Sequence, residues 1–442
     1  MDERAEPETG RLEQLARTRA YLRLLLLAGL VGVPVSAVAF AFLALLYRLT
    51  ALVWEDLPAD FGLDPVPWWW PVPWLLLGGL LTGAAIKWTP GAAGHLPING
   101  LSAEPVRPSY LPGVLLAAVG GLPLGVVLGP EAPLMAVGAA TALILARRTQ
   151  GTPAAMIVGT SGSAAAVAVI FGSPLVAAVF ILEAAGFAGP KLTRLLLPCL
   201  LSAGVGALIF TGLGSWTGLP VSSLELPGLP SAGLHVTDLL WTVPAAVLIA
   251  VGVREVHTLG RRLAPVAQRR PMSMALTAVA VTAACAGAYS LLTGRSPVDV
   301  LLSGQDSLGE LSADPEGLGI GVLVAILVFK GVAYAVSLAA LRGGPIFPGL
   351  FLGAAAGVLL SALPGFGAVP ALAAGMGAAT VAVLPLPVSA AILVTLLLGA
   401  DAAAMAPVVL IAVVVAFVTG RVLDRPRDAE VPEGARAEGA PS

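Results

Sequence analysis

Two short stretches decide the fold of this 442-residue chain. They read GPEAPLMAVG at 129–138 and GPIFPGLFLG at 344–353, so that Gly, Pro, Pro and Gly recur at the same four offsets. Proline fits the first turn of a helix, where its missing N–H leaves no hydrogen bond unmade. Each stretch therefore predicts the start of a helix inside a long apolar region.

The similarity between the two parts of the chain continues about thirty residues further on. Gly162 and Gly375 each begin a run of small residues, and these runs end in FGSPLVAA at 171–178 and LPLPVSAA at 384–391. Two matches in the same order predict an internal duplication. We expect membrane repeats at 20–218 and 237–423, joined by a connecting segment at 219–236. The distribution of charged residues along the chain is compatible with the two repeats crossing the membrane in opposite orientations.

The composition predicts an all-α polytopic membrane protein. Apolar residues make up 57% of the chain and charged residues only 11%, against about 25% charged in a soluble domain. Disorder requires the opposite balance. The 52 glycines and 37 prolines interrupt the apolar runs, as in transporters and channels whose helices break at membrane depth. A net charge of −2 gives no basic excess for nucleic acid, and no metal or cofactor motif is evident.

The charged residues are segregated into loops and tails. The loops at 55–64 and 299–316 carry carboxylates without Lys or Arg, whereas basic residues gather at 11–23 and 254–270. The positive-inside rule places the basic segments in the cytoplasm and the acidic loops outside. We therefore expect an inner-membrane protein with both termini cytoplasmic, a tail at 1–19 and a disordered tail at 424–442.

The two Gly-Pro helix starts suggest a site for an anion. The first N–H groups of a helix have no intrahelical partner, and the helix dipole adds partial positive charge there. Two starts facing each other near the membrane midplane would bind a small anion without a full positive charge, as a transport pathway requires. The alternative is that each Gly-Pro pair only ends one helix and begins another.

At this point the sequence resembles the CLC family of chloride channels and proton-coupled chloride antiporters. Versions of that family's four signatures occur in order: GHLP at 94–97, GPEAP at 129–133, FGSPL with its continuation at 171–183, and GGPIFP with GAAAG at 343–357. The resemblance covers nearly the whole of 20–423. It implies a CLC-type inverted repeat of about eighteen tilted and re-entrant helices in each subunit of a homodimer.

The resemblance also implies which residues form the pore. Glu131 falls on the gating glutamate of the family, and a carboxylate beside an anion site would compete with the anion for the same amides. The alternative is a glutamate that only stabilises a helix start. The residues expected to bind the anion are Gly94, His95, Ala132, Ile346 and Phe347. The His95 side chain either donates to the anion or faces water.

The sequence departs from the family at several pore positions. Glu183 falls on the first of two paired glutamates, for which a structural role is expected over direct proton transfer. The second glutamate, which accepts protons on the inner side of the antiporters, falls on Ala184. Gly94 replaces a serine, and Pro130 replaces an arginine. The late tyrosine of the family has no counterpart near 400–403.

These observations favour passive transport of a small monovalent anion, most simply chloride, through a pore gated by Glu131 and without tight proton coupling. The alternatives are a proton-coupled chloride or fluoride antiporter and a non-conducting membrane protein of the same fold. An intramembrane enzyme is disfavoured, because no nucleophile or metal motif with the required spacing occurs.

Overall fold

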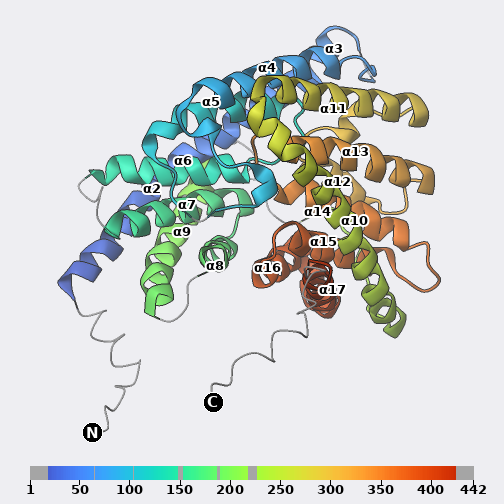
Figure 1. Ribbon diagram of the computed structural model, residues 1–442. Coiled ribbons are helices and arrows are strands. Elements are labelled where there is room, and N and C mark those ends of the chain that lie inside the picture. The colour runs from blue at the N-terminus through green and yellow to red at the C-terminus, as the bar shows by residue number, and fades with distance from the viewer. Residues whose placement is uncertain are drawn as a thin grey trace, which may run out of the picture.

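The computed structural model describes residues 18–63, 65–102, 104–147, 153–186, 190–217 and 226–424. The predicted tails, apart from residues 18, 19 and 424, and the first part of the connecting segment (219–225) lie outside the described residues. The described part contains sixteen α-helices, α2 to α17, with short 3₁₀ turns and no β-strand. It is therefore all-α, as the composition predicts (Figure 1).

The helices follow one another in two similar series. The first series is α2 (Arg19–Ala51), α3 (Leu57–Asp60), α4 (Pro71–Trp88), α5 (Leu111–Gly121), α6 (Glu131–Leu145), α7 (Pro153–Phe171), α8 (Pro174–Ala185) and α9 (Pro190–Thr217). The second series is α10 (Val236–Arg269), α11 (Pro271–Thr293), α12 (Gln305–Ala313), α13 (Ile320–Ala340), α14 (Ile346–Leu360), α15 (Ala368–Val383), α16 (Pro387–Leu397) and α17 (Ala402–Leu423).

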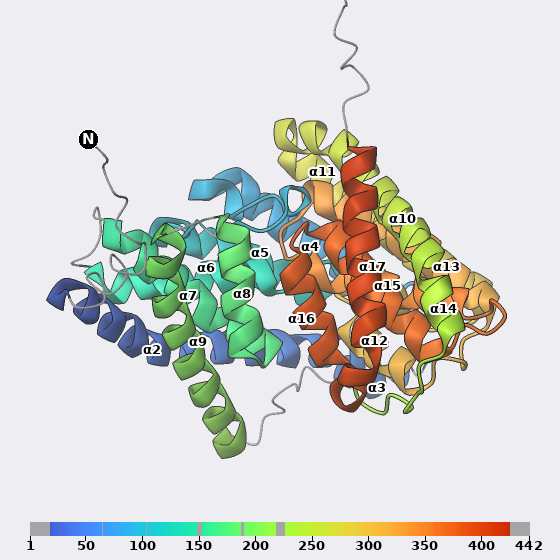
Figure 2. The ribbon, with the colours of Figure 1, turned by 90° about the horizontal axis from the view of Figure 1, so that it is seen from below.

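Two corresponding pairs of helices in the two series have similar lengths, and two corresponding pairs pack against each other. α6 and α14 both have 15 residues, while α8 and α16 have 12 and 11. α4 packs against α11, and α8 against α16. Figure 2 shows α8 and α16 side by side between the first series, in blue and green, and the second, in yellow to red. Contacts between equivalent elements are those expected around the pseudo-two-fold axis of an inverted repeat.

The recurring glycines explain how the short helices pack within each series. A β-carbon at Gly138 of α6 would collide with the Gly162 carbonyl of α7, and one at Gly353 of α14 with the Gly375 carbonyl of α15. The backbones cross in direct contact, as small residues allow in membranes. The glycines that repeat in the sequence are thus equivalent helix-crossing points.

The helix lengths fit a membrane protein with re-entrant segments. In the described part of the chain, seven helical stretches are long and apolar enough to cross a bilayer, and six shorter apolar helices have 10–17 residues. A 15-residue helix is only about 22 Å long, less than the ~30 Å hydrocarbon core. Such helices must end inside the bilayer, where other protein segments cover their ends.

Candidate functional site

The two Gly-Pro helix starts meet at one point inside the molecule. Gly129 and Gly344 form an isolated antiparallel bridge. The Gly129 N–H donates to the Gly344 carbonyl at 2.8 Å, and the Gly344 N–H donates to the Gly129 carbonyl at 2.6 Å. The next residues, Pro130 and Pro345, are the N-caps of α6 and α14. Residues at the same offset in the two repeats thus pair with each other, and both helix N-termini face one region.

Glu131 lies at this meeting point and connects the two repeats. It is the first residue of α6, and its side chain is only 1% exposed. The Phe347 N–H at the start of α14 donates to its Oε1 atom at 3.0 Å. The other carboxylate oxygen, Oε2, is buried and has no hydrogen-bond partner. An N–H at a helix start therefore binds a carboxylate from the opposite repeat.

The space for this carboxylate exists because two neighbouring residues have no side chain. A β-carbon at Gly344 or at Gly129 would overlap Oε2 of Glu131. At these two positions glycine is required by the close approach of the carboxylate to the backbone.

Three of the predicted anion-binding residues lie at the same place. Ile346 and Phe347 are 1% and 3% exposed, and Ala132 is half-buried next to Glu131. The Ile346 backbone N–H also interacts with the Glu131 carboxylate. The Phe347 ring packs on Phe171, with centroids 6.1 Å apart. The structure therefore brings Glu131, Ala132, Ile346 and Phe347 together.

The predicted loop at 94–97 is placed differently. Gly94 has φ +96° and follows two alanines with positive φ, and the His95 side chain is exposed. The Gly94 N–H donates back to the Gly91 carbonyl at 2.9 Å. Among the described residues, neither Gly94 nor His95 forms a hydrogen bond with Glu131. Their role in binding an anion stays a prediction.

Glu183 lies at the second contact between the repeats, where α8 meets α16. Its Oε1 accepts the Val388 N–H at 3.0 Å, and its Oε2 accepts the Ser389 N–H at 2.8 Å and the Ser389 hydroxyl at 2.6 Å. A carboxylate at a helix start satisfies otherwise unpaired N–H groups and interacts well with the dipole. Through these hydrogen bonds Glu183, on α8, holds the first turn of α16 against α8.

A cavity lies between this contact and the meeting point of the helix starts. Its lining includes Phe180, Ile346, Thr380, Leu384 and Ser389. It therefore borders both the α14 start, through Ile346, and the partner of Glu183, through Ser389.

Tyr334 is a residue of the site that the sequence analysis did not identify. It lies on α13, is 1% exposed, and its hydroxyl donates to the Pro345 carbonyl at 2.6 Å. It is also near enough for the charge of Glu131 to act on it. A single tyrosine within an apolar helix is recognisable in the sequence, and a buried tyrosine hydroxyl usually has a hydrogen-bond partner. The sequence did not indicate that this partner is the Pro345 carbonyl.

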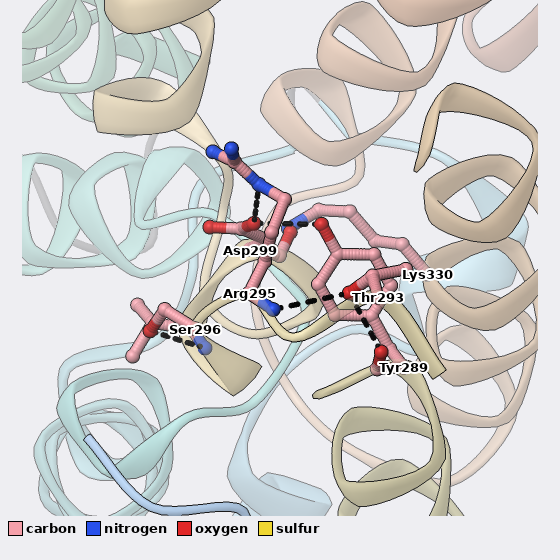
Figure 3. A network of polar contacts seen from close by, with 7 residues as sticks. Tyr289, Thr293, Arg295, Ser296, Asp299 and Lys330 are labelled. Carbon is pink, nitrogen blue, oxygen red and sulfur yellow. Dashed lines mark hydrogen bonds and ion pairs between the residues drawn. The ribbon is translucent and has the colours of Figure 1, made fainter. Parts of the chain in front are cut away.

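Lys330, one turn before Tyr334 on α13, was also missed. Its ammonium group is fully buried, donates to the Asp299 and Leu301 carbonyls at 3.1 and 2.7 Å, and lies 4.9 Å from the Phe351 ring centroid. Figure 3 shows Lys330 beside Asp299, whose carboxylate accepts from Tyr289. The lysine thus holds the segment after α11 against α13 and α14.

The sequence is similar to known ion-transport proteins and matches one protein family. The family model for the voltage gated chloride channel matches residues 97–421. A Salmonella paratyphi A protein named "Putative ion-transport protein YfeO" is 32% identical over 351 residues, covering 78% of this chain and 82% of that protein. The Escherichia fergusonii protein of the same name is 31% identical over 350 residues, covering 78% and 80%.

Solved structures show the same fold. A CLC-type fluoride/proton antiporter superposes with a TM-score of 0.69 at 19% identity, covering 91% of this chain and 96% of that one. A slow cyanobacterial Cl⁻/H⁺ antiporter superposes with a TM-score of 0.71 at 18% identity, covering 91% and 95%. The predicted CLC-type inverted repeat is therefore confirmed. With the family match over most of the sequence, this integral membrane protein belongs to the CLC family of voltage-gated chloride channels and related anion transporters.

Proposed function

We propose that this chain carries a small monovalent anion, chloride, across the bacterial inner membrane through a pore gated by Glu131, without tight proton coupling. The observation that carries the proposal is the hydrogen bond from the Phe347 N–H to the Glu131 carboxylate. A helix-start amide that binds a carboxylate can also bind a halide. Glu131 therefore acts as a built-in anion that closes the pathway while it occupies this position.

Protonation provides the opening step. A neutral carboxyl group accepts a hydrogen bond more weakly than a carboxylate, because charge-assisted bonds are roughly twice as strong. Once protonated, Glu131 can leave the Phe347 N–H, and the amides at the start of α14 become available to a passing anion. These amides carry partial charge only, so the anion can also leave.

The absence of an inner carboxylate beside Glu183 supports uncoupled transport. Ala184 cannot carry a proton, and Glu183 accepts three hydrogen bonds from the start of α16. A proton-coupled antiporter is the second candidate, because two similar solved structures are of a fluoride/proton and a Cl⁻/H⁺ antiporter. The homodimeric state and the cytoplasmic location of both termini belong to the same proposal.

Chloride efflux and pH recorded together from liposomes containing the purified protein test this proposal. We expect chloride efflux at neutral pH that increases on acidification, without proton movement against its gradient. Glu131→Gln should raise efflux at neutral pH and remove the pH dependence, whereas Glu104→Gln, at an exposed loop carboxylate, should behave as the wild type. Unchanged efflux in Glu131→Gln would refute the gate, and uphill proton movement driven by chloride would favour the antiporter. No anion flux in either protein would favour a non-conducting member of the fold.

A further inference from the structure

Arg342 is a buried arginine that the transport cycle described above does not use. It lies in the short segment between α13 and α14, two residues before Gly344, and is only 9% exposed. Among the described residues, no carboxylate forms an ion pair with it. A guanidinium keeps its charge in proteins, and a buried charge without an opposite charge beside it is costly. The counter-charge that Arg342 lacks is what an anion would supply.

The hydrogen bonds of this guanidinium use only part of its donors. Its Nε–H donates to the Ala92 carbonyl at 3.0 Å, and its Nη1 donates to the Leu341 carbonyl at 2.9 Å. The other terminal nitrogen, Nη2, has no hydrogen-bond partner in the part of the chain that the structure describes. The two carbonyls carry partial negative charge only, so they orient the side chain without neutralising it. The N–H groups of Nη2 therefore remain available to a ligand with negative charge.

Ala92 belongs to a strained loop that leads into the GHLP motif. The four residues 91–94 all have positive φ, between +50° and +96°, although the β-carbon of an alanine disfavours this conformation. Such strain persists only where the surrounding structure enforces it, and it is found most often at functional sites. Arg342 supplies such a constraint, because its Nε–H holds the Ala92 carbonyl. Arg342 thus connects the segment before α14 to the loop in which the sequence predicts anion binding by Gly94 and His95.

The helix directions put Arg342 on the cytoplasmic side of Glu131 in the expected orientation. α13 follows the acidic loop at 299–316, which we expect outside, and its 21 residues extend over about 31 Å. α4 likewise follows an acidic loop and ends at Trp88, just before the strained loop. Both helices therefore run inward, and the segments that follow them meet where Arg342 binds the Ala92 carbonyl. An anion from the cytoplasm would thus reach Arg342 before Glu131.

We propose that Arg342 is a further anion-binding residue of the transport pathway, which binds the anion on the cytoplasmic side of Glu131, beside residues 91–95. The anion supplies the negative charge that Arg342 lacks among the described residues, and Nη2 donates to it. The carbonyls of Ala92 and Leu341 offset part of the positive charge, so the anion can also leave. This inference rests on the proposed function, because it assigns a residue to the same anion pathway.

The test is chloride uptake into inside-out and right-side-out membrane vesicles, whose medium contacts the cytoplasmic and the outer face respectively. Arg342→Gln keeps a polar amide but removes the charge. We expect the chloride concentration for half-maximal uptake from the cytoplasmic face to rise about tenfold or more, as for loss of a hydrogen bond to a charged group. The value for the outer face should change much less, and Arg342→Lys, which keeps the charge, should fall between wild type and Arg342→Gln.

Arg254→Gln is the matched control. It removes another arginine that we expect on the cytoplasmic side, but one that already pairs with the Asp424 carboxylate at 3.3 Å. This variant should take up chloride as the wild type does. If Arg342 only holds the strained loop, both of its variants should have a lower melting temperature and the half-maximal chloride concentration of the wild type. That result would overturn the inference.

A measurement on the unmodified side chain covers the case in which Arg342→Gln does not fold. Crystals of the wild type and of Glu131→Gln grown in bromide should both show anomalous scattering beside the Arg342 guanidinium. A bromide peak at the Phe347 N–H of Glu131→Gln without one at Arg342 would leave the gate standing and show that the arginine assignment is wrong. No bromide at either place, together with no chloride uptake by the wild type, would refute the proposed function and this inference with it.

Discussion

The carboxylate of Glu131 occupies the space that a β-carbon would fill at Gly344. Gly344 belongs to the second repeat and Glu131 to the first, so the position of this carboxylate depends on both halves of the duplication. The Gly129–Gly344 bridge fixes this relationship, because it holds the two helix starts in contact.

Gly344→Ala should therefore displace Glu131 from the Phe347 N–H. We expect higher chloride flux at neutral pH, and no further increase when Glu131→Gln is added, since both changes act on the same bond. Gly331→Ala is the matched control, because its β-carbon would meet Val256 at an ordinary 3.7 Å. Additive effects of the two changes would contradict the shared mechanism.

Glu183→Gln should reduce stability without altering proton movement during chloride flux. The amide has one accepting oxygen, so a donor at the start of α16 loses its partner at this half-buried site. A typical intramolecular hydrogen bond contributes about 0.5–1.5 kcal/mol. We expect a lower melting temperature in detergent than for Glu310→Gln, a change at an exposed carboxylate. A normal melting temperature with altered proton movement would assign Glu183 to proton transfer instead.

The glycine crossing between α14 and α15 makes a prediction about folding. Gly375→Val would drive a side chain into the Gly353 backbone, and we expect loss of monodisperse protein after membrane extraction. At Gly420, by contrast, an added β-carbon meets nothing within 4 Å, so Gly420→Val should purify normally. Equal yields of folded protein from both variants would refute the proposed crossing.

Lys330→Met should loosen the segment between α11 and α12. The substitution keeps much of the side-chain volume but leaves the Asp299 and Leu301 carbonyls without their donor, at a cost of roughly 1–3 kcal/mol. We expect a lower melting temperature and faster proteolysis within this segment. Lys87→Met, at an exposed lysine, provides the comparison, and equal proteolysis of the two variants would show that Lys330 does not hold the segment.

The sequence predicted the meeting point of the repeats because a duplication leaves a visible pattern. Equal offsets of Gly129 and Gly344 indicated equivalent residues, and the start of α14 supplied Ile346 and Phe347. Tyr334 and Lys330 could not be found in this way. Each is a single polar residue in an apolar span, and what it contacts is set by how α10, α13 and the α11–α12 segment pack, which no local pattern encodes.

Glu183 illustrates the same limit. Its position was predicted from a motif, but its partners Val388 and Ser389 lie 205 and 206 residues away. The GHLP loop matches a family signature in sequence. In the described structure, however, its residues form no hydrogen bond with Glu131. Motif order thus predicted the fold better than it predicted the contacts of individual side chains.

In the proposed mechanism, Glu131 and a transported anion compete for the same amides at the start of α14. The most direct measurement is calorimetric titration of purified wild type and Glu131→Ala with chloride at constant ionic strength and neutral pH. A hydrogen bond to a charged group contributes roughly 1.5–3 kcal/mol, and 1.4 kcal/mol corresponds to a tenfold change in affinity. We predict chloride binding about tenfold or more tighter in Glu131→Ala. Equal or weaker binding in the variant would show that Glu131 does not compete with chloride for these amides.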